Sequence, residues 1–419
     1  MLARVSPPRR LRGSPRLPGD KSISHRALIL NAIAEGRATL SGLSRGADVL
    51  STASCLGALG VVIEEGAITG VGLDGLQPPT QALDCGNSGT TMRLLAGLLA
   101  GQRFSSELIG DESLSRRPMD RVLEPLRLMG ARLSRDPLRV GGGEGLQGIE
   151  FRMPVASAQV KSALLLAGLY ARGETAVRGG EGTRNHTELM LQKMGATVTT
   201  TPSRVAVLGG QQLRALDVDV PGDLSAAAFW LVAAAIHPDA VIELRAVGTN
   251  PTRSGLLPML SQLGARIQIM PRPGAGVEPV ADLVADSGLG SEPLRVGPQQ
   301  AAGLIDELPA LAVLAACLPG VSLVTGASEL KVKESDRLAA MARGLAAMGA
   351  AVEELPDGWR IQGGRPLHGA RVDSLGDHRI AMALAIAALV AEGNTEIEQA
   401  ECVEISYPGF WSDLEGVCC

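Results

Sequence analysis

The sequence has few aromatic residues, no long apolar run and no strong excess of one charge. Aromatic residues make up 2% of the 419 residues, so the core must consist mainly of Ala, Leu, Val, Ile and Met. No run of apolar residues approaches the length of a membrane-spanning helix. The formal net charge is −5, and neither a broad basic patch nor interleaved aromatic residues are present, which argues against nucleic acid as a partner.

Cysteine is scarce as well. The six cysteines form no C-x-x-C pair and show no metal-ligand spacing with the five histidines, so we expect thiols in a reducing compartment and no metal site. The first 16 residues contain five arginines, but the apolar segment of a secretory signal does not follow them. We therefore expect a cytoplasmic protein. The cysteines are Cys55, Cys85, Cys317, Cys402, Cys418 and Cys419.

The sequence is long enough for two domains. With 419 residues, 45% apolar residues and 20% charged residues, the chain exceeds one ordinary core and is neither disordered nor fibrous. Its 52 glycines indicate many tight turns.

The segment 17–26 places cations and hydroxyls where a helix is expected to begin. It reads Leu-Pro-Gly-Asp-Lys-Ser-Ile-Ser-His-Arg. Backbone N–H groups are unpaired at the start of a helix, and the helix dipole is positive there. Lys21, Ser22 and Arg26 would add to this field, so the segment predicts binding of a phosphate or a carboxylate. A second copy of the opening, Val220-Pro-Gly-Asp-Leu-Ser225, has apolar residues in place of both cations, which indicates a duplicated scaffold with the chemistry on one copy.

A helix-ending pattern, L-x-x-(L/M)-G-(A/V), occurs five times. Glycine after an apolar helical stripe is the usual left-handed C-cap, and a short strand is expected after each copy. Together with a second, Ala- and Leu-rich helix that ends at Gly or Pro, the pattern defines six units of about 70 residues, which are duplicated supersecondary units and not a solenoid. The fourth residues of the five copies are Leu59, Met129, Met194, Leu263 and Met348.

Polar and charged residues recur where the first helix of five units should begin. N-capping explains any one of them, but it does not require cations and hydroxyls at the same position of several repeats. If the units pack in quasi-symmetric threes, these helix starts share one place, and an anionic ligand offsets the repulsion between the cations. The five starts are 20–22, 87–90, 157–159, 306–307 and 377–379.

Seven motifs point to one family. They are Pro18-Gly-Asp-Lys-Ser-Ile-Ser-His-Arg26, Gly86-Asn-Ser-Gly-Thr-Thr-Met-Arg93, Ser115-Arg-Arg-Pro118, Ser157-Ala-Gln-Val-Lys-Ser162, Arg184-Asn-His186, Lys331-Val-Lys-Glu-Ser-Asp-Arg337 and Asp377-His-Arg379. In this order the motifs resemble those of the 5-enolpyruvylshikimate-3-phosphate (EPSP) synthases, which are enolpyruvyl transferases of the shikimate pathway. The resemblance spans nearly the whole chain.

The resemblance implies an α/β fold of two lobes. Each lobe would contain three βαβαββ repeats with helices inside and strands outside, an inside-out α/β barrel. Residues 20–220 would form the lobe on the shikimate 3-phosphate side, and residues 1–19 with 221–419 would form the other lobe. The active site would then lie in the cleft between the lobes.

The implied reaction transfers the enolpyruvyl group of phosphoenolpyruvate to the 5-hydroxyl of shikimate 3-phosphate and releases phosphate. By resemblance the catalytic residues are Asp306, Glu334, Lys333 and Lys21. Shikimate 3-phosphate would contact Lys21, Ser22, Arg26, Ser157, Ala158, Gln159, Arg184, Asp306 and Lys333. Phosphoenolpyruvate would contact Lys21, Asn87, Gly89, Arg117, Gln159, Arg337 and Arg379.

The resemblance implies no cofactor and no metal, and the expected partners are the two small-molecule substrates. We expect a monomer, since the six units already enclose their own cores. Gly89 occupies the position at which glyphosate-insensitive members carry a bulkier alanine, so inhibition by glyphosate is expected. Many relatives carry a lysine near the position of Ile405, and this chain has none there.

The sequence disfavours three other functions. The sister enzyme that acts on UDP-N-acetylglucosamine uses a cysteine in a mobile loop, and residues 108–118 contain no cysteine. A non-catalytic, anion-binding paralogue would have no need of Asp306, Lys333 and Glu334. A kinase is disfavoured because Asp20 would put a negative charge where the phosphates of a nucleotide should lie.

Overall fold

The chain folds into two compact units. The computed structural model describes residues 1–141, 143, 145–274 and 276–419. Unit 1 contains Met1–Pro18, Pro221–Gly274 and Pro279–Cys419, and unit 2 contains Gly19–Val220 and a short segment that ends at Glu278. The chain therefore passes between the units at both Pro-Gly-Asp segments.

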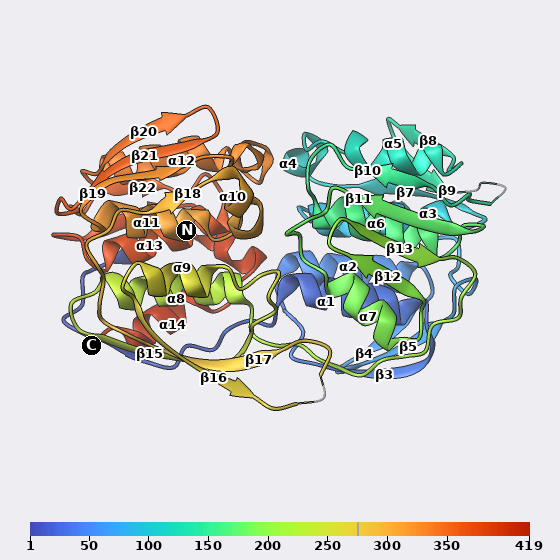
Figure 1. The fold of residues 1–419 in the computed structure, drawn as a ribbon, viewed down its shortest axis with the longest axis horizontal. Coiled ribbons are helices and arrows are strands. Elements are labelled where there is room, and N and C mark those ends of the chain that lie inside the picture. The colour runs from blue at the N-terminus through green and yellow to red at the C-terminus, as the bar shows by residue number, and fades with distance from the viewer. Residues whose placement is uncertain (142, 144, 275) are drawn as a thin grey trace. The chain divides into compact units, whose positions relative to one another are not determined.

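Unit 2 consists of three repeats, each with a central helix, an outer helix and a small sheet (Figure 1). The first contains β14 (Val218–Asp219), α1 (Lys21–Ala32), β3 (Glu35–Ser41), α2 (Ala47–Ala58), β4 (Val62–Glu64) and β5 (Ala67–Val71). The second contains β6 (Leu83–Asp84), α3 (Gly89–Ala100), β7 (Ser105–Ile109), α4 (Glu112–Ser115), α5 (Asp120–Leu128), β8 (Leu133–Arg135) and β9 (Leu138–Gly141). The third contains β10 (Glu150–Arg152), α6 (Ala158–Gly168), β11 (Glu174–Arg178), α7 (His186–Lys193), β12 (Val198–Thr201) and β13 (Arg204–Leu208).

Unit 1 has three repeats of the same kind. The first contains β2 (Leu11–Gly13), α8 (Leu224–Ile236), β15 (Ala240–Gly248), α9 (Leu256–Gln262), β16 (Arg266–Arg272) and β17 (Val280–Asp286). The second contains β18 (Arg295–Val296), α10 (Pro298–Leu304), α11 (Leu308–Cys317), β19 (Gly320–Val324), the 3₁₀ helix η1 (Ser328–Val332), α12 (Arg337–Ala347), β20 (Ala351–Leu355) and β21 (Gly358–Gly363). The third contains β22 (Arg371–Asp373), α13 (His378–Ala388), β23 (Thr395–Glu398), the 3₁₀ helix η2 (Ala400–Ile405) and α14 (Phe410–Val417), with β1 (Ala3–Val5) added from the start of the chain.

Of the six sheets in the described part of the chain, five share one strand arrangement. A short edge strand runs parallel to the strand that follows the central helix, and an antiparallel hairpin completes the sheet, as in the order β6-β7-β9-β8. The strand β2 precedes α1 in the sequence but pairs with β15 of unit 1, and β14 precedes α8 but pairs with β3 of unit 2. Each of these edge strands therefore belongs to the unit that the chain is about to leave. The sixth sheet, β1-β23-β22, has β1 where the other sheets have a hairpin.

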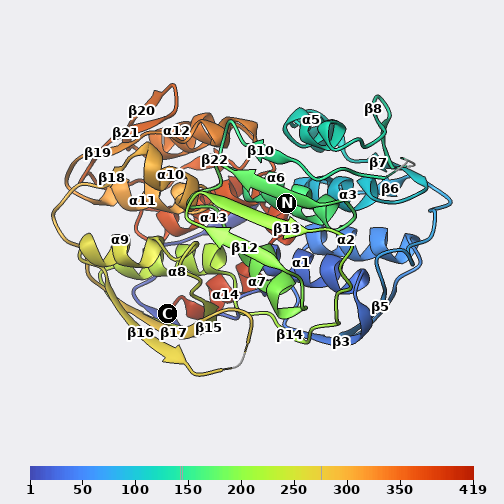
Figure 2. The same cartoon turned by 45° about the vertical axis from the view of Figure 1, so that its right-hand side comes forward.

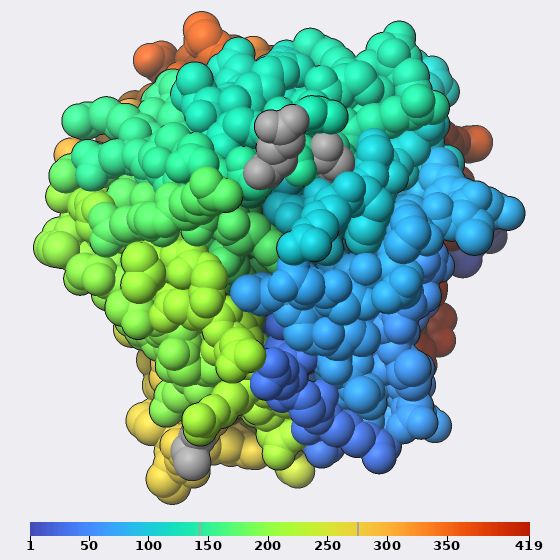
Figure 3. Space-filling model, turned by 90° about the vertical axis from the view of Figure 1, so that its right-hand side faces the viewer, coloured from blue at the N-terminus to red at the C-terminus, as the bar shows by residue number. Residues whose placement is uncertain are grey.

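Helices lie inside each unit and the sheets lie outside (Figures 1 and 2). The central helices α1, α3 and α6 of unit 2, and α8, α11 and α13 of unit 1, are buried along nearly their whole length. Figure 3 shows one face of unit 2, on which the three repeats form three sectors in blue, blue-green and green. The sequence-based prediction of an α/β fold with internal helices is confirmed.

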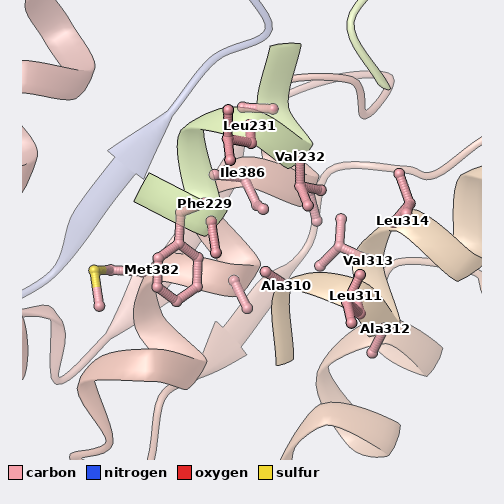
Figure 4. Close-up of a cluster of buried hydrophobic side chains, with 14 of the residues drawn as sticks. Phe229, Leu231, Val232, Ala310, Leu311, Ala312, Val313, Leu314, Met382 and Ile386 are labelled. Carbon is pink, nitrogen blue, oxygen red and sulfur yellow. The ribbon is translucent and has the colours of Figure 1, made fainter. Parts of the chain in front are cut away.

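Small and aliphatic side chains make up these cores. In unit 1, one buried cluster contains Phe229 and Val232 of α8, Leu311 of α11, and Met382 and Ile386 of α13 (Figure 4). Side chains of this size let the helices approach one another closely over their full length.

The predicted glycine C-caps are confirmed in all five copies. The fourth residue of each pattern is the C-cap of an outer helix: α2, α5, α7, α9 or α12. The glycine that follows has a φ between 86° and 96°, a conformation that costs glycine nothing and other residues about 1 kcal/mol or more. These glycines are Gly60, Gly130, Gly195, Gly264 and Gly349.

Within the described residues, no single helix combines the length and the apolar composition needed to cross a membrane, and one bent pair, α10 with α11, passes that test by length and composition only.

The contact between α3 and α6 yields a stability prediction. A Cβ atom added to Gly97 of α3 would lie 2.2 Å from the carbonyl oxygen of Ala163 in α6. We expect Gly97→Ala to lower the free energy of unfolding by about 1–3 kcal/mol or more, because one helix backbone must move. The urea midpoint of unfolding measures this change.

Gly57 provides the matched control. It lies in α2, and an added Cβ would meet nothing within 4 Å. Gly57→Ala should be neutral or stabilise by about 0.5–1 kcal/mol, since alanine has less backbone entropy to lose. Equal midpoints for the two variants would contradict the predicted α3–α6 packing constraint.

Candidate functional site

Most candidate residues of unit 2 lie at or near the starts of its three central helices, while Arg117 and Arg184 precede the outer helices α5 and α7. Asp20, Ser88 and Ser157 are the N-caps of α1, α3 and α6, and each side chain accepts a hydrogen bond from a backbone N–H in the first helical turn. The remaining N–H groups and the positive ends of the helix dipoles make these starts favourable for anions. The predicted start of each helix is confirmed.

Ser22, Arg26 and Arg184 form the first cluster. Nη1 of Arg184 donates to Oγ of Ser22 over 2.9 Å, and Nη1 of Arg26 donates to the carbonyl oxygen of Ser22 over 2.9 Å. Arg26 is also held by Thr187 and Ser162, which accept hydrogen bonds of 2.7 Å from its Nε and Nη2. The guanidinium of Arg26 is thus fixed in orientation before any ligand arrives.

Burial changes the acid–base properties of this cluster. Desolvation lowers the pKa of Arg26 to about 10, an effect that Glu188 opposes and Arg184 reinforces. Glu188 itself is buried and pairs with Lys161 over 2.6 Å. Burial, with Lys21 and Arg26 nearby, holds the pKa of His25 well below its ordinary value, so this imidazole is neutral at physiological pH and adds no further cation.

Lys21 begins α1 and is oriented by a carboxylate. Its Nζ lies 2.8 Å from Oδ2 of Asp48, which belongs to the first turn of α2, and the Lys21 side chain keeps 16% of its surface exposed. The ammonium group is therefore positioned and still reachable by a small anion.

The second cluster of unit 2 is built around Asn87 and Arg117. Nη1 and Nη2 of Arg117 donate to the carbonyl oxygen and to Oδ1 of Asn87, over 3.1 and 2.6 Å. Beside it, Arg93 donates to Oε1 of Gln159 over 2.5 Å, and Nε2 of Gln159 donates to Thr90 over 2.9 Å. Two buried guanidinium groups therefore flank the start of α3.

Gly89 leaves room for this arrangement. A Cβ at Gly89 would lie 2.8 Å from Nη1 of Arg93 and 3.5 Å from Nη1 of Arg117. A side chain at this position would force the guanidinium of Arg93, which contacts Gln159, to shift.

The candidate residues of unit 1 lie where α11, α12 and α13 begin. Asp306 precedes α11, Arg337 is the first residue of α12, and Arg379 is the second residue of α13. Oδ1 of Asp306 lies 3.7 Å from Nη1 of Arg337 and 3.5 Å from Nε of Arg379. Nη1 of Arg379 also donates to the carbonyl oxygen of Asp306 over 2.9 Å.

Arg337 connects two further carboxylates. Its Nη2 donates to Oε2 of Glu334 over 2.5 Å and its Nε to Oδ2 of Asp377 over 2.8 Å. Burial alone would lower the pKa of Arg337, but Asp377 and Glu334 outweigh it and raise that pKa above its ordinary value. Asp377 also caps α13 by accepting from the backbone N–H of Arg379.

Lys333 follows η1 and lies among the same charges. Desolvation lowers the pKa of Lys333, while the negative charge of Asp306 opposes this effect and the positive charge of Arg337 adds to it. A lysine of this kind gives up its proton at a lower pH than an exposed lysine does.

Several residues of these clusters were not predicted from the sequence. Arg93 and Asp377 lie inside quoted motifs, so their position next to predicted residues was an available signal. Asp48 and Glu278 lie outside the quoted motifs, and nothing in the sequence pointed to a role for them. Oε1 of Glu278 nevertheless lies 2.7 Å from Nδ1 of the buried His186, 92 residues away along the chain.

Among the described residues, no group of three or more His, Cys, Asp or Glu side chains is placed to hold a metal ion. The arrangement instead presents arginine and lysine side chains and helix starts, which bind anions, next to carboxylates that can transfer protons.

Comparison with known proteins agrees with this chemistry. The sequence model of the family described as EPSP synthase (3-phosphoshikimate 1-carboxyvinyltransferase) matches residues 5–414. The chain belongs to the EPSP synthase family. It is 52% identical to a 3-phosphoshikimate 1-carboxyvinyltransferase of Halorhodospira halophila over 97% of this chain and 94% of that protein. The corresponding protein of a Synechococcus strain is 51% identical over 98% and 95%.

A solved EPSP synthase structure from Acinetobacter baumannii covers the whole chain, with a TM-score of 0.87 and 41% identity over 98% of the solved chain. The protein is therefore an enzyme of the shikimate pathway, which leads to aromatic amino acids. As an EPSP synthase it transfers the enolpyruvyl group of phosphoenolpyruvate to shikimate 3-phosphate and releases phosphate.

Proposed function

We propose that the clusters of both units form one active site, in a cleft between a lobe of residues 20–220 and a lobe of residues 1–19 with 221–419. The observation that carries the proposal is the group formed by Asp306, Glu334, Arg337 and Arg379 in unit 1, because it combines proton-transferring carboxylates with cations. The candidates of unit 2 are cations, hydroxyls and amides, which suit the phosphates and carboxylates of the two substrates.

Shikimate 3-phosphate is assigned to the first cluster of unit 2. Ser22 and Arg26 bind its carboxylate, and Ser157, the backbone of Ala158 and Arg184 bind its phosphate. The hydrogen bond between Arg184 and Ser22 supports this assignment, because it keeps the two anion-binding groups adjacent. Lys21, Gln159, Asp306 and Lys333 complete the set of contacts.

Phosphoenolpyruvate is assigned to the second cluster and to the arginines of unit 1. Arg117, Arg337, Arg379, Lys21 and Gln159 hold it. Asn87 and Gly89 bring backbone N–H groups to its phosphate at the start of α3. Bidentate contacts from arginine orient a carboxylate or a phosphate as well as binding it.

In the proposed chemistry one proton is delivered to C3 and later removed from it, and one proton is taken from the 5-hydroxyl and passed to the leaving phosphate. Glu334 delivers a proton to C3 of the enol, so C2 becomes an oxocarbenium-like electrophile. Asp306 takes the proton of the attacking 5-hydroxyl, and a C–O bond forms at C2. Glu334 then removes a proton from C3 while phosphate leaves C2 and takes up the proton held by Asp306, which restores the enol and both carboxylates. Lys333 and Lys21 donate hydrogen bonds to the reacting oxygens, where charge changes most.

We also propose that the enzyme acts as a monomer in the cytoplasm and is inhibited by glyphosate. The separate core of each unit supports the monomer, since neither unit needs a partner to bury its helices. All six cysteines are free thiols in the structure, which suits a reducing compartment.

Glu334→Gln tests the proton-transfer role. We expect kcat to fall by about 10²–10⁴-fold, because glutamine keeps the shape and the bond to Arg337 but carries no transferable proton. The measurement is phosphate release from phosphoenolpyruvate plus shikimate 3-phosphate without nucleotide, together with a binding titration of shikimate 3-phosphate, which should be unchanged. Glu354→Gln on the exposed strand β20 is the control, and unchanged turnover in Glu334→Gln would remove Glu334 from the chemistry.

The pH profile tests Lys333. Its pKa is lowered chiefly by desolvation, so it loses its proton as the pH rises through a value below that of an ordinary lysine. If the protonated amine is required, kcat/KM should fall in that alkaline range. Lys333→Arg should move the fall to higher pH, because arginine stays protonated. The exposed Lys193→Arg serves as control, and an identical alkaline limb in all three proteins would refute the assignment.

Gly89→Ala tests the phosphoenolpyruvate cluster. The added methyl group displaces Arg93 from Gln159, so the KM for phosphoenolpyruvate and the inhibitory concentration of glyphosate should both rise, by roughly 10–200-fold. The KM for shikimate 3-phosphate should change little. Gly57→Ala is the matched control, and a wild-type protein that is fully active in millimolar glyphosate would contradict the expected sensitivity.

A further inference from the structure

We infer that Glu307 is a positioning residue for Asp306 and acts through Ser225 of α8. The inference rests on the proposed role of Asp306 in catalysis. The two neighbouring carboxylates have different environments: the Asp306 side chain keeps 16% of its surface exposed and faces Arg337 and Arg379, whereas Glu307 is fully buried.

Glu307 makes a contact with another helix. Oγ of Ser225 donates a hydrogen bond to Oε1 of Glu307. Ser225 lies in the first turn of α8, and Glu307 is the N-cap residue of α11. The N-caps Asp20, Ser88, Ser157, Asp223 and Asp377 of the other central helices instead accept hydrogen bonds from their own first turns. Glu307 therefore joins the starts of α8 and α11, two helices that pack together.

A buried arginine completes the connection. Nη2 of Arg253 donates to Oγ of Ser225 over 2.8 Å and to Oδ1 of Asp223 over 2.5 Å. The single hydroxyl proton of Ser225 is committed to Glu307, so the lone pairs of Ser225 Oγ are available to Arg253. At most 6% of the surface of any of these four residues is exposed.

This network fixes the backbone that carries Asp306. On one side, Glu307 is tied to α8 through Ser225. On the other side, Arg379 donates to the carbonyl oxygen of Asp306. The main chain at 306–307 is held between these contacts, which leaves the Asp306 carboxylate only its own side-chain rotations. A buried charged network is costly compared with apolar packing, and precise placement of a catalytic carboxylate accounts for that cost here.

The test uses Glu307→Gln and Ser225→Ala, alone and combined, in the full-length enzyme. Ser322→Ala is the matched control, because Ser322 is as buried as Ser225 and its Oγ also makes a buried hydrogen bond, to the backbone N–H of Leu294. We expect kcat to fall roughly tenfold to 100-fold in both single variants, since small displacements of a reacting group have effects of this size. The KM of each substrate and the affinity for shikimate 3-phosphate should stay unchanged.

Three outcomes decide the question. A double variant that loses no more kcat than the worse single variant supports one shared connection. A wild-type kcat in Ser225→Ala and Glu307→Gln overturns the inference, as does an equal loss in Ser322→Ala at a matched thermal midpoint. Asp306→Asn separates this failure from that of the proposed function: an active Asp306→Asn would refute the role of Asp306 itself. Should Glu307→Gln fail to fold, Ser225→Ala, which removes one oxygen, carries the test.

Discussion

Complete burial of the central helices is the constraint on which the rest of the structure depends. A helix surrounded by other elements carries mainly apolar side chains along its length, as α8 and α13 do. Its polar residues must then lie at its ends, where the backbone N–H groups also need partners. Three such helices per unit concentrate unpaired N–H groups, positive dipole ends and cationic side chains at their starts. Anion binding follows from the packing, before any specific substrate is considered.

Carboxylates make this concentration of positive charge tolerable in the absence of substrate. Asp48 holds Lys21, and Asp377 with Glu334 holds the fully buried Arg337. Each pairing reduces the repulsion among cations and fixes the donor in one orientation, so little reorganisation remains when a ligand binds. The same pairings explain why Glu334 and Asp306 lie beside arginines: the groups that stabilise the cations are also the groups that can transfer protons.

Local features of the fold and site could be predicted from the sequence, and long-range partners could not. The C-cap at Met194 and the helix start at Lys21 depend on residues within one or two turns, so their patterns are visible in the sequence. Asp48 and Glu278 look like ordinary surface residues in the sequence, because only the folded chain brings them to Lys21 and His186. Arg93 was visible inside a motif, but its partner Gln159 belongs to another repeat.

The two Pro-Gly-Asp copies show how duplication separates structure from chemistry. In the first copy, Lys21 begins the helix, remains partly exposed and leaves the helix start accessible to an anion. In the second copy, Leu224 takes the equivalent position, and the cation at this helix start, Arg253, comes from a loop and is buried. In the sequence the second copy contains no cation of its own, because Arg253 lies 30 residues after Asp223 and reaches the helix start only in the folded chain. The helix start is thus available to an anion in the first copy, whereas in the second copy the buried side chain of Arg253 occupies it. Arg253 can connect α8 to α11 through Ser225 and Glu307 because no ligand has to displace it.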